Sequence, residues 1–166
     1  LGELDRRLRT AGGLVPNDSL PIPEAERKSA IAERIDSLTG LYRPSEFMRR
    51  ANAFLEARRN GTWCIATVDM GHMRLFNEWH GQAEGARVLA DVGTVLKDIE
   101  NADMGVAGYW GQDDFCVLIP FKHITVHQIY NRVREAVARH DDGVGFWPSM
   151  GVYPIDSNEE ITIDAQ

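Results

Sequence analysis

The sequence is poor in cysteine: its 166 residues include only Cys64 and Cys116, each inside a short apolar run. Two cysteines are too few for a disulfide framework or a zinc site, which excludes the small folds that depend on either. A chain of this length buries enough surface to fold without disulfides or a bound metal. We therefore expect both thiols to be free and buried, as is usual in a reducing compartment.

Long apolar runs are missing as well, and positive charge is in the minority. No run approaches the ~18 apolar residues that a membrane-spanning helix needs, and no basic stretch before an apolar core marks a signal peptide. Lysine and arginine number 18 against 25 aspartates and glutamates, a formal net charge of −7. Nucleic acids and anionic membranes attract basic surfaces, so neither is expected as a general partner. An anionic ligand would need a local source of positive charge, such as a metal ion or a helix N-terminus.

The first 35 residues differ from the rest in composition. Residues 1–22 mix a short helical pattern with glycines and prolines, which is typical of a linker. Residues 23–34 begin with a proline and continue with good helix formers, which predicts a helix. We expect residues 1–35 to be a linker and a helix from an upstream region, and residues 36–166 to be one domain. The chain starts with Leu1 rather than Met, so we expect it to be a piece of a longer polypeptide.

From residue 36 onward, apolar periodicity predicts short strands and amphipathic helices. In the first half, the expected elements are a helix over 45–59 capped by Ser45, a strand over 63–68 that ends on Asp69, a short helix over 72–79 and a turn over 81–85. In the second half, they are a helix over 88–99, strands over 105–110 and 114–119 joined by a turn, a helix over 124–139 and a strand near 150–153.

This order predicts an α+β fold: a ferredoxin-like, or split βαβ, antiparallel sheet with helices packed around it. The simplest version has the helices on one face of the sheet. In this topology the first strand lies between the third and fourth strands and runs antiparallel to both. The end of the first strand then lies beside the start of the third.

That topology brings three carboxylates to one edge of the sheet. Asp69 closes the first strand, and Asp113 and Asp114 precede the third. Converging carboxylates repel unless water, a proton or a cation relieves the charge, and Mg²⁺ typically takes one or two carboxylates plus substrate phosphates. Free N–H groups at a helix start near Gly71 and His72 would suit a nucleoside triphosphate. The alternative is structural: Asp69 caps the next helix, and the other two are ordinary hairpin residues.

Five motifs occur along the chain: Asp36-Ser-Leu-Thr-Gly-Leu-Tyr, Asp69 at a strand end, Asn77-Glu-Trp-His-Gly, Gly111-Gln-Asp-Asp-Phe and Ser149-Met-Gly-Val. Together, in this order and spacing, they resemble the bacterial diguanylate cyclase domain family, named GGDEF after its Gly-Gly-Asp-Glu-Phe hairpin. The resemblance covers about residues 36–166 and implies the family's ferredoxin-like palm of the nucleotidyl-cyclase type. Active members condense two GTP molecules into cyclic di-GMP across a homodimer, and members usually form the output end of a sensor protein.

The resemblance therefore implies several partners. They are GTP or a related guanine nucleotide, an upstream sensor domain in the same polypeptide that would signal through the helix before residue 36, and a second copy in a homodimer. It also implies a cytoplasmic location, either free or tethered to a membrane sensor outside this stretch. No nucleic acid and no membrane contact by this domain are expected.

Site residues follow from the resemblance too. It implies that Asp69 and Asp113 bind Mg²⁺ or Mn²⁺ with help from the Met70 carbonyl, and that Asp113 and Asp114 form the catalytic pair, Asp114 being one methylene shorter than the family's glutamate. The residues implied at the nucleotide are Asn77 at guanine, Arg74 at phosphate, Gly111 and Gln112 in the hairpin, and His72 and Met73 at the helix start.

Several positions depart from the family pattern. Ala86 stands where the family has the aspartate that reads guanine, so half of the base recognition is lost. Gln112 replaces the second hairpin glycine, and a side chain there obstructs or alters the approach of the ligand. The family's inhibitory Arg-x-x-Asp motif would fall at Ala102 to Gly105 and is absent, so no product feedback is expected there. The family's last helix, which clamps the triphosphate, would lie beyond Gln166.

Three functions remain open on these grounds. The first is a degenerate member that binds GTP or a related nucleotide with Mg²⁺ but turns it over weakly or not at all, as a regulatory module. The second is an active diguanylate cyclase, which works by positioning and by metal neutralisation of phosphate charge. The third is a dimerisation or partner-binding domain with a vestigial pocket. Asp69, Asp113 and Asn77 favour ligand binding, and Ala86 and Gln112 argue against full activity, so the first is preferred.

Overall fold

The computed structural model describes residues 22–140 and 145–155, and the chain divides into two compact units, Leu1–Ala30 and Ile31–Gln166. The predicted linker lies almost entirely outside the described residues. Helix α2 (Glu24–Arg34) begins one residue after Pro23, where the sequence predicts its start, and none of its residues is buried. Within the described residues, no helix combines the length and apolarity needed to cross a bilayer.

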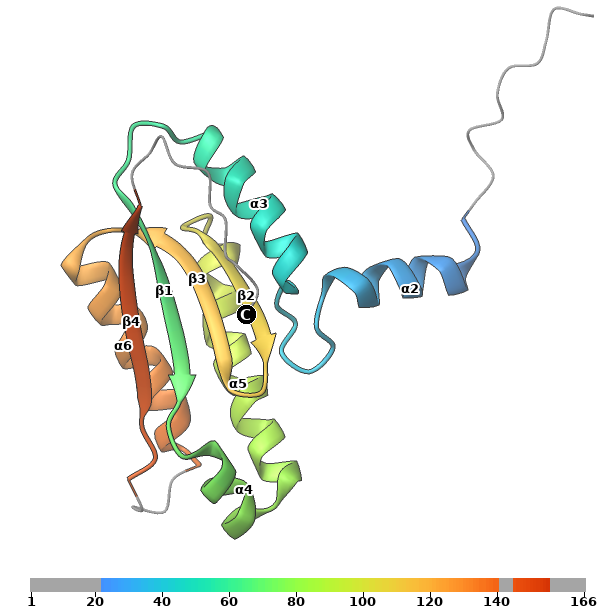
Figure 1. Cartoon of the computed structure of the whole chain (residues 1–166), viewed down its shortest axis with the longest axis vertical. Helices are drawn as coiled ribbons and strands as arrows, with labels where there is room; N and C mark the ends of the chain where they lie inside the picture. Colours follow the sequence, from blue (N-terminus) through green and yellow to red (C-terminus); the bar gives the residue numbers. More distant parts are fainter. Residues whose placement is uncertain (1–21, 141–144, 156–166) are drawn as a thin grey trace, which may run out of the picture. The chain divides into compact units, whose positions relative to one another are not determined.

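A four-stranded antiparallel sheet forms the centre of the second unit (Figure 1), in the order β2-β3-β1-β4. Its strands are β1 (Trp63–Met70), β2 (Val106–Gly111), β3 (Asp114–Pro120) and β4 (Pro148–Ile155). Strand β1 pairs antiparallel with both β3 and β4. The predicted α+β, ferredoxin-like topology is therefore confirmed, including the central place of the first strand.

Two long helices, α5 (Gln82–Asn101) and α6 (His123–Ala138), cover one face of the sheet and lie behind it in Figure 1. The short helix α4 (Met73–His80) joins β1 to α5 at one end. Alternate residues of β1 and β3 point to this face, because side chains alternate along a strand. The fully buried members of this core include Ala66, Val68, Met70, Val88, Val92, Leu96, Val117, Ile119 and Val133.

The remaining helix, α3 (Pro44–Glu56), packs on the opposite face, so the expectation of helices on one face is wrong. Phe47 is fully buried there, with its ring in edge contact with Trp110 of β2 at 5.1 Å between centroids. Ile65, Cys116 and Leu118, from the other parity of β1 and β3, complete this second core. The sheet is thus covered on both faces, with α3 alone on one of them among the described helices.

Element boundaries differ from the sequence prediction at several places, and two of the differences concern an expected cap and an expected turn. Ser45 does not cap α3: the cap residue is Arg43, which makes no side-chain capping bond, and Pro44 occupies the first turn, where its missing N–H costs nothing. The expected turn over 81–85 is helix, since Gly81 alone separates α4 from α5. By contrast, both cysteines are free and buried as predicted, and burial raises the pKa of the Cys116 thiol to about 12.

His140, just after α6, ties that helix to the start of α5. Its Nδ1 lies 2.8 Å from Glu84 Oε1, and its Nε2 lies 2.6 Å from Asp91 Oδ2. Burial lowers the pKa of His140, but its hydrogen bonds to Glu84 and Asp91 outweigh burial and raise the pKa above the ordinary 6.5. The hydrogen bond from His140 also lowers the pKa of Glu84, so both partners are charged near pH 6.

We expect the stabilisation that this contact gives the domain to decrease as pH rises. Because the pKa of folded His140 is raised, its contribution is complete below pH 6.5 and is lost as pH rises through the folded pKa. Replacing His140 by Gln should remove about 1 kcal/mol at pH 6 and much less at pH 8, measured by urea unfolding at both values. A His127→Gln control should keep the wild-type pH slope. Equal losses at both pH values would contradict the ion-pair explanation.

Candidate functional site

Three carboxylates meet where β1 ends and the β2–β3 hairpin turns. In the strand register, Asp69 of β1 lies directly opposite Asp114, the first residue of β3. Asp113 occupies the turn, between Gly111 and Asp114, which are paired across the hairpin. Figure 1 shows this turn at the same end of the sheet as the arrowhead of β1 and helix α4. The predicted convergence of Asp69, Asp113 and Asp114 is therefore present.

The electrostatics of this cluster suit a cation. Burial raises the pKa of Asp114 first, and the negative charges of Asp113 and Asp69 raise it further. Like charges placed directly opposite on neighbouring strands destabilise the pair, so a cation or a proton bound there would relieve the repulsion. The cluster consists of oxygen donors alone, the donor type that Mg²⁺ prefers.

Structural roles do not account for all three carboxylates. Helix α4 begins after His72, whose backbone is left-handed at φ 64°, and no side chain caps it. Asp69 therefore does not cap α4, which removes one of the structural explanations given above. Asp113 is a turn residue, as that explanation holds, while Asp114 already belongs to β3. A turn position and a metal-binding role are compatible for Asp113.

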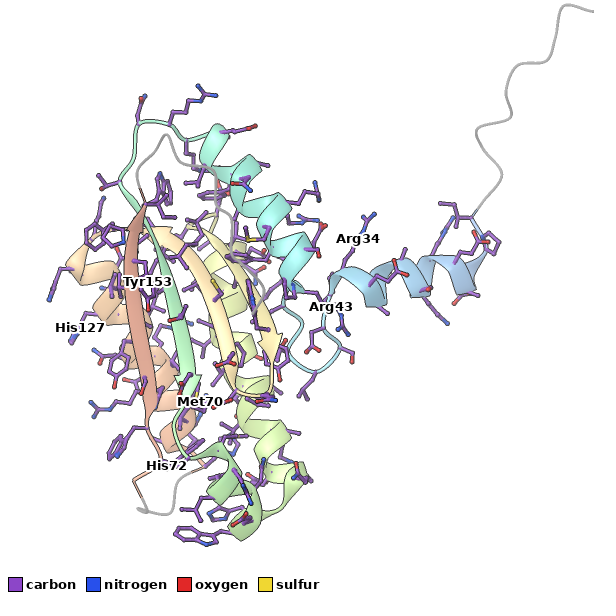
Figure 2. The ribbon with its side chains drawn as sticks, in the orientation of Figure 1. Arg34, Arg43, Met70, His72, His127 and Tyr153 are labelled. Carbon is purple, nitrogen blue, oxygen red and sulfur yellow. The ribbon has the colours of Figure 1, made fainter. Side chains whose placement is uncertain are left out.

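The donor set for a metal is small. Within residues 22–140 and 145–155, no group of three histidine, cysteine, aspartate or glutamate side chains is arranged to hold an ion. The Met70 side chain is fully buried, so only its backbone carbonyl is left to coordinate. Figure 2 shows Met70 and His72 at the end of β1 that leads into α4. The residues present fit a two-carboxylate magnesium site completed by phosphate oxygens, which is the usual arrangement for this ion.

A cavity of about 830 Å³ opens beside this cluster. Its volume lies within the range of small-molecule binding sites. The predicted site residues that line it are His72, Met73, Arg74, Asn77, Ala86, Gln112 and Asp113. Asp69, Met70, Gly111 and Asp114 are not part of its wall. The structure thus gathers the predicted nucleotide residues around one cavity, except Gly111, and the carboxylate cluster meets this cavity at Asp113.

Asn77 of α4 is the most informative residue of this wall. Its Oδ1 is buried and has no hydrogen-bond partner, a condition that costs ~1–3 kcal/mol in the absence of a ligand. The amide is pressed against Gly85 of α5, where a Cβ atom would lie only 1.8 Å from Oδ1. Gly85 therefore leaves the space that the amide occupies. Rotation of the amide would turn this oxygen away from Gly85, and a ligand N–H group could then satisfy it.

The hairpin turn is held in an unusual conformation. Gly111 has φ 104° and Gln112 has φ 51°, a region that glycine adopts far more readily than glutamine. The Tyr109 hydroxyl donates a hydrogen bond to the Gln112 carbonyl at 2.7 Å, which stabilises the turn. Burial raises the pKa of Tyr109, and the carboxylates of Asp36 and Asp113 raise it further. The Gln112 side chain lies at the cavity wall, where the family pattern has only hydrogen.

Some lining residues were missed by the sequence analysis. They are Leu38, Glu78, Gln82, Gly85, Leu89 and Tyr109. Gln82 and Gly85 were hidden because the turn expected over 81–85 separated them from the long helix. Tyr109 carries no polar pattern of its own, and only its place two residues before Gly111 could have drawn attention to it. Arg74, expected at phosphate, pairs with Glu78 at 3.2 Å and is highly exposed.

Comparisons with known proteins agree with this geometry. The family model described as "Diguanylate cyclase, GGDEF domain" matches residues 33–155. Among solved structures, the GGDEF domain of DgcB from Caulobacter crescentus, in complex with c-di-GMP, has a TM-score of 0.62 and 21% identity, over 76% of this chain and 80% of that one. The diguanylate cyclase SiaD from Pseudomonas aeruginosa, in complex with its activator SiaC, has a TM-score of 0.61 and 22% identity, over 94% of this chain and 58% of that one. At these identities the structural likeness shows a shared fold.

Proposed function

The chain belongs to the GGDEF domain family of diguanylate cyclases, and on that basis we propose that it is a regulatory module that binds GTP with Mg²⁺ and turns it over weakly or not at all. One observation carries the proposal. Asn77, whose buried Oδ1 is unpaired, lines the same cavity as Asp113 of the carboxylate cluster, so the proposed base-binding residue and a proposed metal ligand share one space.

In this proposal Asp69 and Asp113 hold the metal with the Met70 carbonyl, and Mg²⁺ supplies neutralisation of charge on the triphosphate. Asn77 binds the base through its amide. Backbone N–H groups at the start of α4, at His72 and Met73, face the phosphates, because the first N–H groups of a helix have no partner within it. Arg74 would reach a phosphate with its terminal nitrogens while its Nε keeps the exposed ion pair with Glu78.

Weak turnover is proposed because the hairpin and base wall are altered. Gln112 brings a side chain to the cavity wall beside Asp113, where a reacting phosphate would have to approach the backbone. Ala86 offers a methyl group and no acceptor to a guanine N–H, so one contact that would position the base is lost. Each change weakens positioning, on which phosphoryl-type transfer mainly depends. We further propose a cytoplasmic homodimer regulated by a sensor domain upstream of α2.

Removing Asp69 should abolish metal-dependent nucleotide binding. Binding of the α,β-methylene analogue of GTP is measured by calorimetry with Mg²⁺ and with EDTA. We expect binding by the wild type in Mg²⁺ only, and at least a tenfold loss in Asp69→Ala. The control is Asp103→Ala, which removes an exposed carboxylate paired with Arg58 and should bind as the wild type does. Wild-type binding that persists in EDTA would contradict the proposed metal site.

An active cyclase is the second candidate, favoured by the complete set Asp69, Asp113 and Asp114. Mass spectrometry of a reaction with GTP and Mg²⁺ or Mn²⁺ decides between the two. Cyclic di-GMP from the wild type but not from Asp113→Ala would establish the cyclase. The third candidate, a dimerisation domain with a vestigial pocket, requires that no nucleotide shift the melting temperature at any metal concentration.

A further inference from the structure

We propose that the base end of the cavity recognises a purine without distinguishing guanine from adenine, so that adenine nucleotides bind about as well as guanine nucleotides. The proposal rests on the proposed function, because it concerns the same cavity. The observation that carries it is the polar composition of the wall formed by α4 and the start of α5. That wall offers carboxamides to the base but no free carboxylate.

Asn77 is the anchor of this wall. Asn77 lines the cavity, and its Oδ1 is buried against Gly85 without a partner. A carboxamide has both a donor and an acceptor, and a half-turn of the amide exchanges the two. It can accept from guanine N1–H and donate to guanine O6. It can equally accept from the adenine amino group and donate to a ring nitrogen, the pairing that asparagine commonly makes with adenine.

The facing wall on α5 adds no group that would choose between these bases. Gly85, Ala86 and Leu89 contribute only backbone, a methyl group and an aliphatic chain. Gln82, one turn earlier, brings a second carboxamide, which is again both donor and acceptor. Among the α4 and α5 residues that line the cavity, Glu78 is the one carboxylate, and Arg74 holds it at 3.2 Å on the exposed side of α4.

The missing carboxylate matters because it would be an acceptor only. A carboxylate beside the base favours guanine, which presents N1–H and an amino group, and repels adenine, whose N1 carries a lone pair. Selectivity of this kind arises when a buried polar group of the site is left unpaired by the wrong ligand. A methyl group at Ala86 imposes no such penalty on either base. The pocket therefore recognises the base by its shape and by one hydrogen-bonding amide, and both purines satisfy these two requirements.

The first test compares the α,β-methylene analogues of GTP and ATP, titrated with Mg²⁺ into the wild-type chain by calorimetry. We expect dissociation constants within about threefold of each other. A preference of about tenfold or more for either purine, equivalent to ~1.4 kcal/mol, would overturn the inference and leave the proposed function standing. Failure of both analogues to bind would overturn the proposed function and the inference with it.

The second test restores the missing acceptor. Ala86→Asp should favour the GTP analogue by about tenfold or more, the range expected for one well-placed polar contact. The matched control is Ala86→Asn, which has nearly the same shape but no charge and should stay unselective. Ala86 is half-buried in the second turn of α5, where an acidic residue is compatible with the helix dipole. If Ala86→Asp folds but remains unselective, the base does not lie at this wall and the inference fails. If Ala86→Asp does not fold, the wild-type comparison alone decides.

Discussion

Replacing Gly85 by alanine is expected to weaken nucleotide binding in the cavity strongly while leaving the domain folded. The new Cβ would lie 1.8 Å from Asn77 Oδ1 and 3.0 Å from the terminal methyl of Met73. Both atoms are at the ends of side chains that can rotate, so the helices can stay in place. The Asn77 amide must then swing out of its position, and binding of the GTP analogue should weaken by about tenfold to a hundredfold, as for loss of a buried polar contact.

A double-mutant cycle isolates this effect. Asn77→Ala removes the amide that the new Cβ would strike, so adding Gly85→Ala to it should change neither the melting temperature nor residual binding much further. Residues in contact show such non-additivity, whereas independent sites do not. Equal effects of Gly85→Ala in the two backgrounds would mean that the substitution acts on α5 itself rather than through the amide. Calorimetry with the GTP analogue and thermal unfolding together provide both readouts.

Among the substitutions proposed here, Phe47→Ala should lower the free energy of unfolding most, by about 3–5 kcal/mol. Its ring is fully buried under α3, in edge contact with Trp110, and it covers Gly108 so closely that a Cβ there would lie 2.8 Å from the ring. Alanine at this position would leave a cavity between α3 and the sheet. A fall in melting temperature of about 10 °C or more is expected, measured by calorimetry.

An exposed aliphatic residue gives the matched control. Ile124 of α6 is 64% exposed, so Ile124→Ala should change stability by no more than about 0.5 kcal/mol. Comparable losses for Phe47→Ala and Ile124→Ala would show that α3 does not form a genuine second core. Because Trp110 lies in β2 directly before the hairpin turn, Phe47→Ala should also increase amide hydrogen exchange at Gln112 and Asp113.

The sheet was predictable because its strands carry complete local signals. The run from Trp63 to Val68 is short and apolar on both parities, and Gly111 to Asp113 marks a tight turn between two strands. Given those signals, chain order alone places the first strand in the middle, since few topologies satisfy short, right-handed connections. The meeting of Asp69 with Asp114 follows from that order and not from any local pattern.

What could not be predicted depends on packing partners. Periodicity showed that one side of α3 is apolar, but it cannot say which face of the sheet that side covers. Glycine in the 81–85 stretch looked like a helix breaker, yet Gly85 lies inside α5, where its missing side chain makes room for Asn77. Such a close approach is invisible in sequence, because the two residues meet only after α4 folds back along α5.

The sheet order also has a kinetic consequence. The β2–β3 hairpin and the contacts of α4 with α5 are local, whereas β1 pairs with β3 and β4 across long stretches of chain. Closing such loops is slow relative to forming hairpins and helices. Asp69 and Asp114 should therefore come together only in the final, cooperative step of folding, after the hairpin turn has already formed. An isolated hairpin peptide would carry Asp113 and Asp114 without a working metal site, and recovery of ligand binding should be the last event observed during refolding.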